Sequence, residues 1–322
     1  MASLRLAVIV SIMALIAAPS TTRADPSLPN PVRIVVPFSP GGSNDVIARA
    51  IAPLLGKRLG VSVVVENRPG AAGVIGAESV ARAARDGSAL LVTSSSFLTA
   101  AAAQSKLPFD PITALAPVAM IARGPMLVAV PAAGSIGSLD ELLAAARAAP
   151  GALNYGSAGV GSIAHLSTEL LNADARIQTT HVPYKGASEA ILGLVGNQIQ
   201  LMISNYSSLV GQLKGGKLKA IAVTSAQPSP AFPDLPPIAR AVPGFAVDIW
   251  VGVFAPAGLP APLLTRLNHE LNAIATAPEL QALLAPDGAV AQALDAATFG
   301  ETVRADFALW KRIVTERKLV TE

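Results

Sequence analysis

VRIVVPFSPGGSNDVIARAI, residues 32–51, is the stretch that decides the fold. Residues 32–36 are mostly β-branched and predict a short strand. Residues 37–43 are rich in proline, glycine and serine and predict a loop. Apolar residues then recur at helical spacing from Asn44 to Leu59, although Pro53 predicts a kink or an early end. The order of strand, glycine-rich loop and helix begins a β-α-β unit.

The same alternation continues along the rest of the chain. Strands are expected at residues 61–65, 89–93, 126–130, 153–155, 179–182, 201–204, 218–224 and 249–254. Helices are expected at residues 77–84, 139–149, 163–172, 189–196, 262–276 and 298–317. This order predicts an α/β protein built on a parallel sheet with helices on both faces.

A second stretch repeats the design of the first. Residues 154–166 read NYGSAGVGSIAHL, which again places a strand before a glycine-rich loop and a helix. The backbone amides of such a loop and of the helix start point outward together and bind anions without a basic side chain. Two such loops, one in each lobe, would hold a carboxylate ligand from both sides.

The first 24 residues resemble an export signal. Arg5 is followed by an apolar run from Leu6 to Ala18 and by a polar stretch that ends at Ala24, where cleavage is expected. A membrane anchor is the alternative, but the run is short for a bilayer. Removal of this segment takes away two arginines and lowers the formal net charge from +3 to +1.

Composition and motifs exclude several classes of function. The chain is 52% hydrophobic and only 14% charged, without a basic run, which argues against disorder and against nucleic-acid binding. It has no cysteine, and its three histidines lack metal-ligand spacing, so neither a disulfide nor a metal site is expected. Tyr155 stands where a nucleophile elbow needs glycine, and no catalytic acid pair is recognised. We expect a protein without enzymatic activity and without a cofactor.

Single residues in these loops have structural interpretations as well. Ser157 and Ser162 are suited to helix capping, which does not exclude contact with a ligand. Asp45 at a helix start is more often a structural acid than a ligand contact. Tyr184 and Lys185 follow a strand and could serve either packing or ligand binding. The glycines of residues 70–76 lack the spacing of a dinucleotide-binding loop and indicate a turn.

Several further phrases, taken in order, carry a family resemblance. They are VVENRPGAAG (64–73), HVPYKG (181–186), GKLKAIAVTS (216–225) and FAPAG (254–258), in addition to the two loop segments. Together they resemble the Bug-type (TctC-like) substrate-binding proteins of the tripartite tricarboxylate transporters, over essentially the whole mature chain. The resemblance implies a periplasmic binding fold of type II, a Venus flytrap with two α/β lobes and a hinge of crossing strands.

The expected domains follow from this resemblance. Residues 1–24 form the signal peptide, residues 25–124 and 246–322 form lobe 1, and residues 125–245 form lobe 2. The ligand-binding residues expected between the lobes are Phe38, Ser39, Gly41, Gly42, Ser43, Asn44, Asp45, Ser94, Ser95, Ser157, Ala158, Gly159, Gly161, Ser162, His165, Tyr184, Ser204 and Asn205. The family often has aspartate where this chain has Ser204, which weakens the case for an amino-acid ligand.

The resemblance implies a periplasmic solute-binding protein that captures a small carboxylate and delivers it to a two-component membrane transporter. An alternative is a receptor that presents its closed form to a sensor kinase. A secreted hydrolase is disfavoured, because no nucleophile with a base is recognised. The ligand stays open among aliphatic acids, amino acids and aromatic acids. Four aromatic residues of the cleft loops, Phe38, Phe97, Tyr184 and Tyr206, keep the aromatic acids in consideration.

Overall fold

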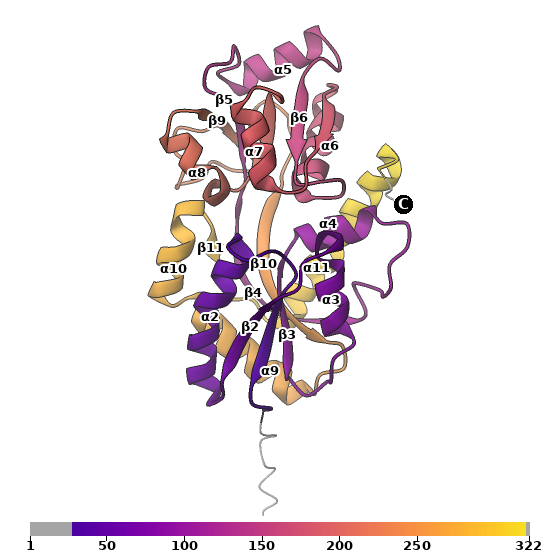
Figure 1. Ribbon diagram of the computed structural model, residues 1–322, viewed down its shortest axis with the longest axis vertical. Coiled ribbons are helices and arrows are strands. Elements are labelled where there is room, and N and C mark those ends of the chain that lie inside the picture. Colours follow the sequence, from indigo (N-terminus) through magenta and orange to yellow (C-terminus); the bar gives the residue numbers. More distant parts are fainter. Residues whose placement is uncertain (1–27, 320–322) are drawn as a thin grey trace, which may run out of the picture.

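The computed structural model describes residues 28–319 and contains two β-sheets, one in each half of the molecule (Figure 1). The first sheet has the order β11-β4-β10-β3-β1-β2. Its strands are β1 (Val32–Val36), β2 (Val63–Asn67), β3 (Ala89–Ser94), β4 (Leu115–Pro125), β10 (Asp248–Pro256) and β11 (Val290–Ala291). The expected signal peptide and its cleavage after Ala24 lie outside the described residues.

The second sheet has the order β7-β6-β8-β5-β9. Its strands are β5 (Leu127–Pro131), β6 (Asn154–Ser157), β7 (Thr180–Pro183), β8 (Leu201–Ser204) and β9 (Leu218–Val223). Each sheet has helices packed against it, so the expected two-lobed α/β architecture is confirmed. We call the half around the first sheet lobe 1 and the other half lobe 2. The residue boundaries given above for the lobes stay a prediction.

Lobe 1 is a three-layer structure. Its helices are α2 (Ser43–Leu59), α3 (Val74–Ala81), α4 (Ser96–Ala103), α9 (Ala261–Ala275), α10 (Pro278–Leu284) and α11 (Ala296–Arg317), with 3-10 turns at Ala71–Gly73 (η1) and Ala285–Asp287 (η3). Successive residues of β1 face opposite layers. Ile34 packs with α2 and α9, whereas Val35 packs with α3, α4 and the start of α11.

Lobe 2 has the helices α5 (Leu139–Ala148), α6 (Ile163–Ala175), α7 (Ala187–Val195) and α8 (Tyr206–Lys214), with a 3-10 turn at Ile238–Arg240 (η2). Serine capping explains where two of them begin. The Ser138 hydroxyl accepts from the Glu141 amide at the start of α5, and the Ser162 hydroxyl accepts from the His165 amide at the start of α6. The expected capping role of Ser162 is therefore confirmed.

One sequence-based expectation is wrong, and one of the two alternatives expected at Pro53 is excluded. The sheets are mixed, because β10 runs antiparallel to β3 and β4, and β5 runs antiparallel to β8 and β9. The crossing strands impose this. The chain leaves lobe 1 along β4 and returns along β10, so these two strands run in opposite directions. Helix α2 also does not end early at Pro53, which is exposed, so water can reach the carbonyl that its missing N–H leaves free.

The crossing strands meet at Thr224. Strand β4 continues into β5 through Met126, and the segment after β9 returns to β10. The Thr224 hydroxyl accepts from the Met126 amide (2.8 Å), and the Thr224 carbonyl accepts from the Val247 amide (3.0 Å). One residue therefore ties both crossing segments together at the hinge.

Helix α11 connects the two lobes a third time. Phe299 and Val303, near its start, belong to the core of lobe 1. Trp310 and Val314, near its end, pack in one cluster with Leu166 and other core residues of lobe 2. The C-terminal end of α11 lies beside α4 and α6 (Figure 1).

Candidate functional site

The two glycine-rich loops lie where the strand order of each sheet reverses. In lobe 1 the chain passes from β1 to β2 on one side and then to β3 on the other. In lobe 2 it passes from β6 to β7 and then back to β8 on the other side of β6. Such topological switch points, at the carboxyl ends of the strands, are where open α/β sheets bind ligands.

The strand register places both switch points on the side of their lobe that is next to the crossing strands. Ser94, at the end of β3, pairs with Val251 beside the crossing strands. Ser204, at the end of β8, pairs with Leu127, the first residue after the crossing. Because both carboxyl ends lie at the crossing, the loop after β1 and the loop after β6 face each other from opposite lobes.

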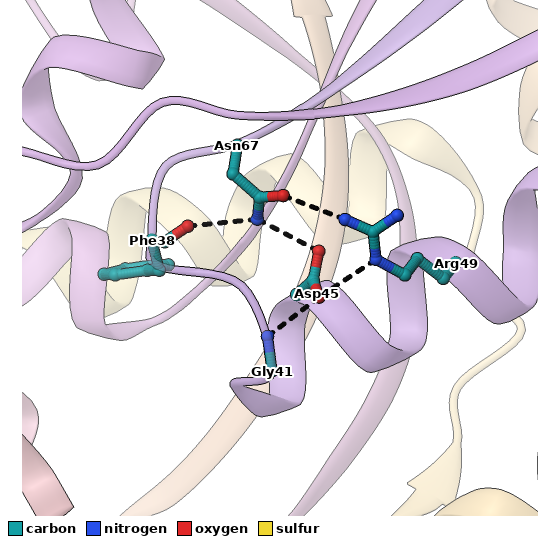
Figure 2. Close-up of polar contacts among 5 residues, drawn as sticks. All are labelled: Phe38, Gly41, Asp45, Arg49 and Asn67. Atoms are coloured by element: carbon teal, nitrogen blue, oxygen red, sulfur yellow. Dashed lines mark hydrogen bonds and ion pairs between the residues drawn. The ribbon is translucent and has the colours of Figure 1, made fainter.

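Asp45 organises the loop of lobe 1 (Figure 2). Its buried carboxylate accepts hydrogen bonds from the Gly41 amide (2.9 Å), from Arg49 Nε (3.0 Å) and from Asn67 Nδ2 (3.0 Å). Burial acts to raise the pKa of Asp45, but the hydrogen bonds from Arg49, Gly41 and Asn67 together hold this pKa below its ordinary value. Asp45 therefore stays ionised and shapes the loop, which agrees with its interpretation as a structural acid.

Asn67 extends this network beyond the loop. Its side-chain amide also donates to the Phe38 carbonyl (3.1 Å), and its carbonyl oxygen accepts from Arg49 (3.0 Å). Figure 2 shows Asn67 between the loop backbone at Phe38 and the first turns of helix α2. Sequence reasoning did not assign Asn67 to the site. Two signals were available: its place two residues after an expected strand, and its occurrence in the phrase VVENRPGAAG (64–73).

A hydrogen bond between Asn44 and Ser94 connects the first turn of helix α2 to the end of strand β3 at the lobe 1 switch point. Asn44 Nδ2 donates to Ser94 Oγ over 3.3 Å, and both residues are buried. Among the described residues, Asn44 Oδ1, Ser95 Oγ and Thr93 Oγ1 are buried atoms without a hydrogen-bond partner. Unpaired buried polar atoms are costly, so partners from a ligand or from water are expected here.

The start of helix α2 adds backbone donors to this corner. Within residues 28–319 no protein group accepts from the amides of Ser43 or Asn44, as is usual in the first turn of a helix. Gly42 is the N-cap residue and is exposed, and Ser39 and Gly41 are exposed beside it. The predicted residues of this loop therefore do come together, with Asp45 beneath the others.

The loop of lobe 2 is supported from below by its own side chains. Ser157 Oγ accepts from the Gly159 amide (3.1 Å), and His165 Nδ1 accepts from the Gly161 amide (3.1 Å). The Ser162 hydroxyl donates to the Gly159 carbonyl (2.7 Å). Gly159 and Gly161 have φ angles of +109° and +79°, which suit glycine. These side chains hold the loop rather than extend beyond it.

A pair of stacked imidazoles lies beneath this loop. The ring centroids of His165 and His181 are 4.0 Å apart, and His181 Nε2 lies 2.6 Å from Ser157 Oγ. Burial lowers the pKa of His165 to about 3, with a further contribution from His181, and burial lowers the pKa of His181 to about 4. Both rings are therefore neutral at neutral pH. His165 was expected to contact the ligand, but it is buried and acts through the loop.

The donors of lobe 2 that stay free are backbone amides. Within the described part of the chain, no protein group accepts from the amides of Ala158, Val160, Ile163 or Ala164. Ala158 and Val160 are exposed at the tip of the loop. These free amides are the kind of neutral donors that the sequence predicts for an anion site at this loop, and the site itself stays a prediction.

The remaining predicted residues divide into two groups. Ser204 is buried at the end of β8, next to Asn205, so both lie at the lobe 2 switch point. Tyr184, by contrast, lies with its ring against Gly156 and Gly193, and its hydroxyl donates to Gln198 Oε1 (3.4 Å). This arrangement supports the packing interpretation of Tyr184.

The aromatic residues expected near the ligand mostly pack within their lobes. Phe97 is fully buried and lies parallel to Phe109 at a centroid distance of 6.3 Å. Phe38 is half-buried, packs against the core of lobe 1 and approaches Gly73. Tyr206 is half-buried and lies at a tilt to Phe232, with centroids 5.5 Å apart. Little aromatic surface therefore remains for a ligand ring.

The described residues provide no group of acidic or histidine side chains that could hold a metal ion. Within the same range, no helix has the length and apolar character needed to cross a membrane. The candidate site consists of backbone amides, hydroxyls and the carboxamides of Asn44 and Asn205. Chemically, such a site can bind an anion by neutral hydrogen-bond donors.

Comparisons with known proteins concern the chain and its fold as a whole. The family model described as "Tripartite tricarboxylate transporter family receptor" matches residues 47–319. Protein BugT of Bordetella pertussis is 36% identical over 260 residues, which are 80% of this chain and 79% of BugT.

Solved structures give the same result. The periplasmic binding protein BugD superposes with a TM-score of 0.80 at 31% identity, over 90% of this chain and 98% of BugD. Rpa4515 of R. palustris with adipate superposes with a TM-score of 0.81 at 34% identity, over 88% of this chain and 96% of that one. MatC of Rhodopseudomonas palustris with bound malate gives 0.78 at 32% identity, over 88% and 98%.

Proposed function

Because this chain belongs to the tripartite tricarboxylate transporter receptor family, in which it is similar to the Bug proteins, we propose that it captures a small carboxylate between its lobes in the periplasm and delivers it to a two-component membrane transporter. One observation carries the proposal. Two helix starts with unpaired amides face each other from the two switch points. The adipate and malate in the related structures have the chemistry that such donors suit.

Each lobe contributes a different set of donors to the proposed site. Lobe 1 offers the amides of Ser43 and Asn44 with the unpartnered side-chain atoms of Asn44 and Ser95. Lobe 2 offers the amides at Ala158 and Val160 and at the start of α6. A carboxylate held from both sides stabilises the closed arrangement of the lobes, because it contacts both only when they are together.

The other predicted residues have supporting roles in this proposal. Asp45, Ser157 and His165 hold the two loops in shape through their hydrogen bonds. Gly41, Gly159 and Gly161 provide the positive φ angles that the loops need. Gly42 and Ser162 are N-cap residues at the two helix starts, where the backbone approaches the ligand.

Neither donor set contains a cationic side chain, which affects how the site would bind an anionic ligand. A neutral site binds anions with moderate electrostatic attraction and with strong dependence on geometry. Because Phe97, Tyr184 and Tyr206 pack within their lobes, we propose an aliphatic acid with at least one carboxylate as the ligand, and a role in binding rather than in catalysis. No feature of the described residues favours a sensor kinase as partner, whereas the family description includes a transporter.

A ligand panel tests the proposal. Purified mature protein is screened by thermal shift against adipate, malate, succinate, citrate, glutamate and benzoate, and each hit is measured by calorimetry. We expect stoichiometric binding of at least one aliphatic acid. Adipamide, which has the same carbon chain without charge, is the matched control for adipate. Absence of binding by every acid, or equal binding of adipamide and adipate, would contradict the carboxylate site.

A further inference from the structure

Helix α8 of lobe 2 is capped by a residue of lobe 1. Asn205 stands at its N-cap position but caps no backbone amide, because its side chain bonds to Ser207 Oγ (2.8 Å) and to Ser208 Oγ (2.9 Å). The amide of Ser207 instead donates to Asp287 Oδ1 over 2.5 Å. Asp287 ends the turn η3, which lies between α10 and β11 of lobe 1. The capping hydrogen bond therefore joins the lobes.

The chain around Asp287 fits closely against lobe 2. Gly288 has a φ angle of +64°, and a Cβ atom placed on it would lie 3.0 Å from Ala231 Cβ and 3.1 Å from Phe232 Cε2. Phe232 in turn contacts the ring of Tyr206 in the first turn of α8. Residues 285–288 are thus seated in a corner formed by residues 229–232 and the start of α8.

The opposite side of the molecule is held in another way. There Ala102 and Ala103 of α4 pack in one apolar cluster with Leu166 of α6 and Trp310 of α11. Gly161 approaches Ala103 so closely that a Cβ atom on it would lie 2.9 Å from Ala103 Cβ. Figure 1 shows α8 and α10 on one side of the crossing strands, and α4, α6 and the end of α11 on the other.

The two sides differ in what separation would cost. Parting the α4–α6–α11 side exposes buried apolar surface at roughly 25 cal/mol for each Å². Parting the α8–η3 side breaks one capping hydrogen bond and a small contact. Opening of the lobes is therefore expected at the α8–η3 side, with the apolar side staying together.

We propose that Asp287 is a latch between the lobes, a positioning residue that sets ligand affinity without contact with the ligand. In the open form its carboxylate and the Ser207 amide are separated, and closure restores their hydrogen bond. Only the predicted change in affinity rests on the proposed function. The change in the balance between open and closed forms is independent of any ligand.

The test measures the distance between the lobes in the ligand-free protein. The chain has no cysteine, so cysteines introduced at the exposed residues Lys57 and Lys214 give one label site in each lobe. Distance distributions by double electron–electron resonance are compared for the labelled parent and its Asp287→Ala variant. We expect a larger open population in the variant. With adipate or another acid that binds the parent, we expect a 2- to 30-fold higher Kd, the range of about 0.5–2 kcal/mol known for capping residues.

Asp295→Ala is the matched control. Asp295 caps helix α11 by the same kind of bond, since its Oδ1 accepts from the Thr298 amide (2.8 Å), but both residues belong to lobe 1. This variant should lose stability without a change in distance distribution or Kd. Ser207→Pro, which removes the donor at a position in the first helical turn where proline is tolerated, should reproduce the Asp287→Ala result. An unchanged distribution in folded Asp287→Ala protein, or an equal shift in Asp295→Ala, would overturn the latch.

Discussion

Asn67 Nδ2 donates to Asp45 Oδ1 over 3.0 Å, so the end of strand β2 fixes the first turn of helix α2. The same carboxylate accepts from the loop amide of Gly41 and from Arg49. The loop that provides the lobe 1 part of the proposed site is therefore shaped by one buried acid. Its geometry is set before any ligand arrives.

Replacement of Asp45 by alanine should lower both stability and ligand affinity. The change leaves the Gly41 amide without its acceptor and removes one of the two acceptors of Asn67 Nδ2, at a cost of about 1–3 kcal/mol. Urea denaturation and calorimetry measure the two effects. Arg49→Ala is the control, since the Arg49 side chain is 53% exposed, and its loss should cost less than about 1 kcal/mol. Equal losses in the two variants would show that Asp45 does not organise the loop.

Gly41 and Gly42 should respond differently to the same substitution. Gly41 has a φ angle of +83°, so Gly41→Ala should lower stability by about 1–2 kcal/mol through backbone strain. Gly42 has a φ angle of −75°, and a Cβ atom there would lie 3.7 Å from the Ser39 carbonyl oxygen, an ordinary contact. Gly42→Val should therefore fold normally yet bind at least about tenfold more weakly, because the added side chain blocks the helix start. Thermal melts and calorimetry separate the two outcomes, and normal affinity of Gly42→Val would remove this helix start from the site.

The buried histidines should make the protein less stable in acid. Burial lowers the pKa of His165 to about 3 and that of His181 to about 4, whereas the unfolded chain protonates near pH 6.5. Between about pH 6.5 and pH 4 the unfolded state therefore binds more protons, and the free energy of unfolding falls as pH falls. The slope is on the order of 1 kcal/mol per pH unit for each histidine.

Comparison of urea midpoints at pH 7 and pH 5 checks this expectation. Burial raises the pKa of Asp248, Asp287 and Asp306, which acts in the opposite direction, so the wild-type slope alone is insufficient. His165→Asn keeps a side-chain acceptor for the Gly161 amide and removes the titrating ring. It should lose less stability than wild type between the two pH values. An identical loss would exclude His165 as a source of the acid sensitivity.

Aliphatic acids should bind more tightly than aromatic ones. Phe97 is buried against Phe109 and Tyr184 packs on helix α7, which leaves little ring surface for stacking. Calorimetry with adipate and benzoate compares the two classes, and Tyr206→Ala tests the aromatic residue nearest the lobe 2 switch point. Tighter binding of benzoate that disappears in Tyr206→Ala would reverse this conclusion and restore an aromatic ligand.

The exported protein should begin at or near Asp25. The charged start, the short apolar run and the small residue at Ala24 motivate this expectation. Intact mass spectrometry of protein from the periplasmic fraction measures the N-terminus. Detection of Leu6–Ala18 in the periplasmic protein would contradict cleavage and favour a membrane anchor.

Local patterns predicted much of this structure. The β-branched run before Pro37 and the glycines after it placed β1, its loop and α2 correctly, and Ser162 marked the start of α6. Strand β4 was missed because its sequence, LAPVAMIARGP, contains two prolines and a glycine. Pro117 lies next to a shift in the register between β4 and β10, and Pro125 is the last residue of the strand.

Other features depend on contacts that are distant in the sequence. Strand direction is set by which lobe the chain has just left, so β5 and β10 could not be oriented from local pattern. The cap of α8 comes from Asp287, eighty positions beyond its partner Ser207. Asn205 stands at the N-cap and is a residue type that favours capping, but its side chain bonds to Ser207 Oγ instead of a backbone amide. Burial of His165 beneath its loop likewise follows from packing against His181 of the neighbouring strand.

Helix α11 has a consequence for protein engineering. Its last turns fill the core of lobe 2 with Trp310 and Val314, while its first turns remain in lobe 1. A fragment confined to residues 125–245 would expose the apolar hollow where Trp310 lies, and we expect it to aggregate. Chimeras that exchange lobe 2 between homologues must therefore exchange the C-terminal half of α11 as well. We therefore expect the two lobes to unfold together and not as separable modules.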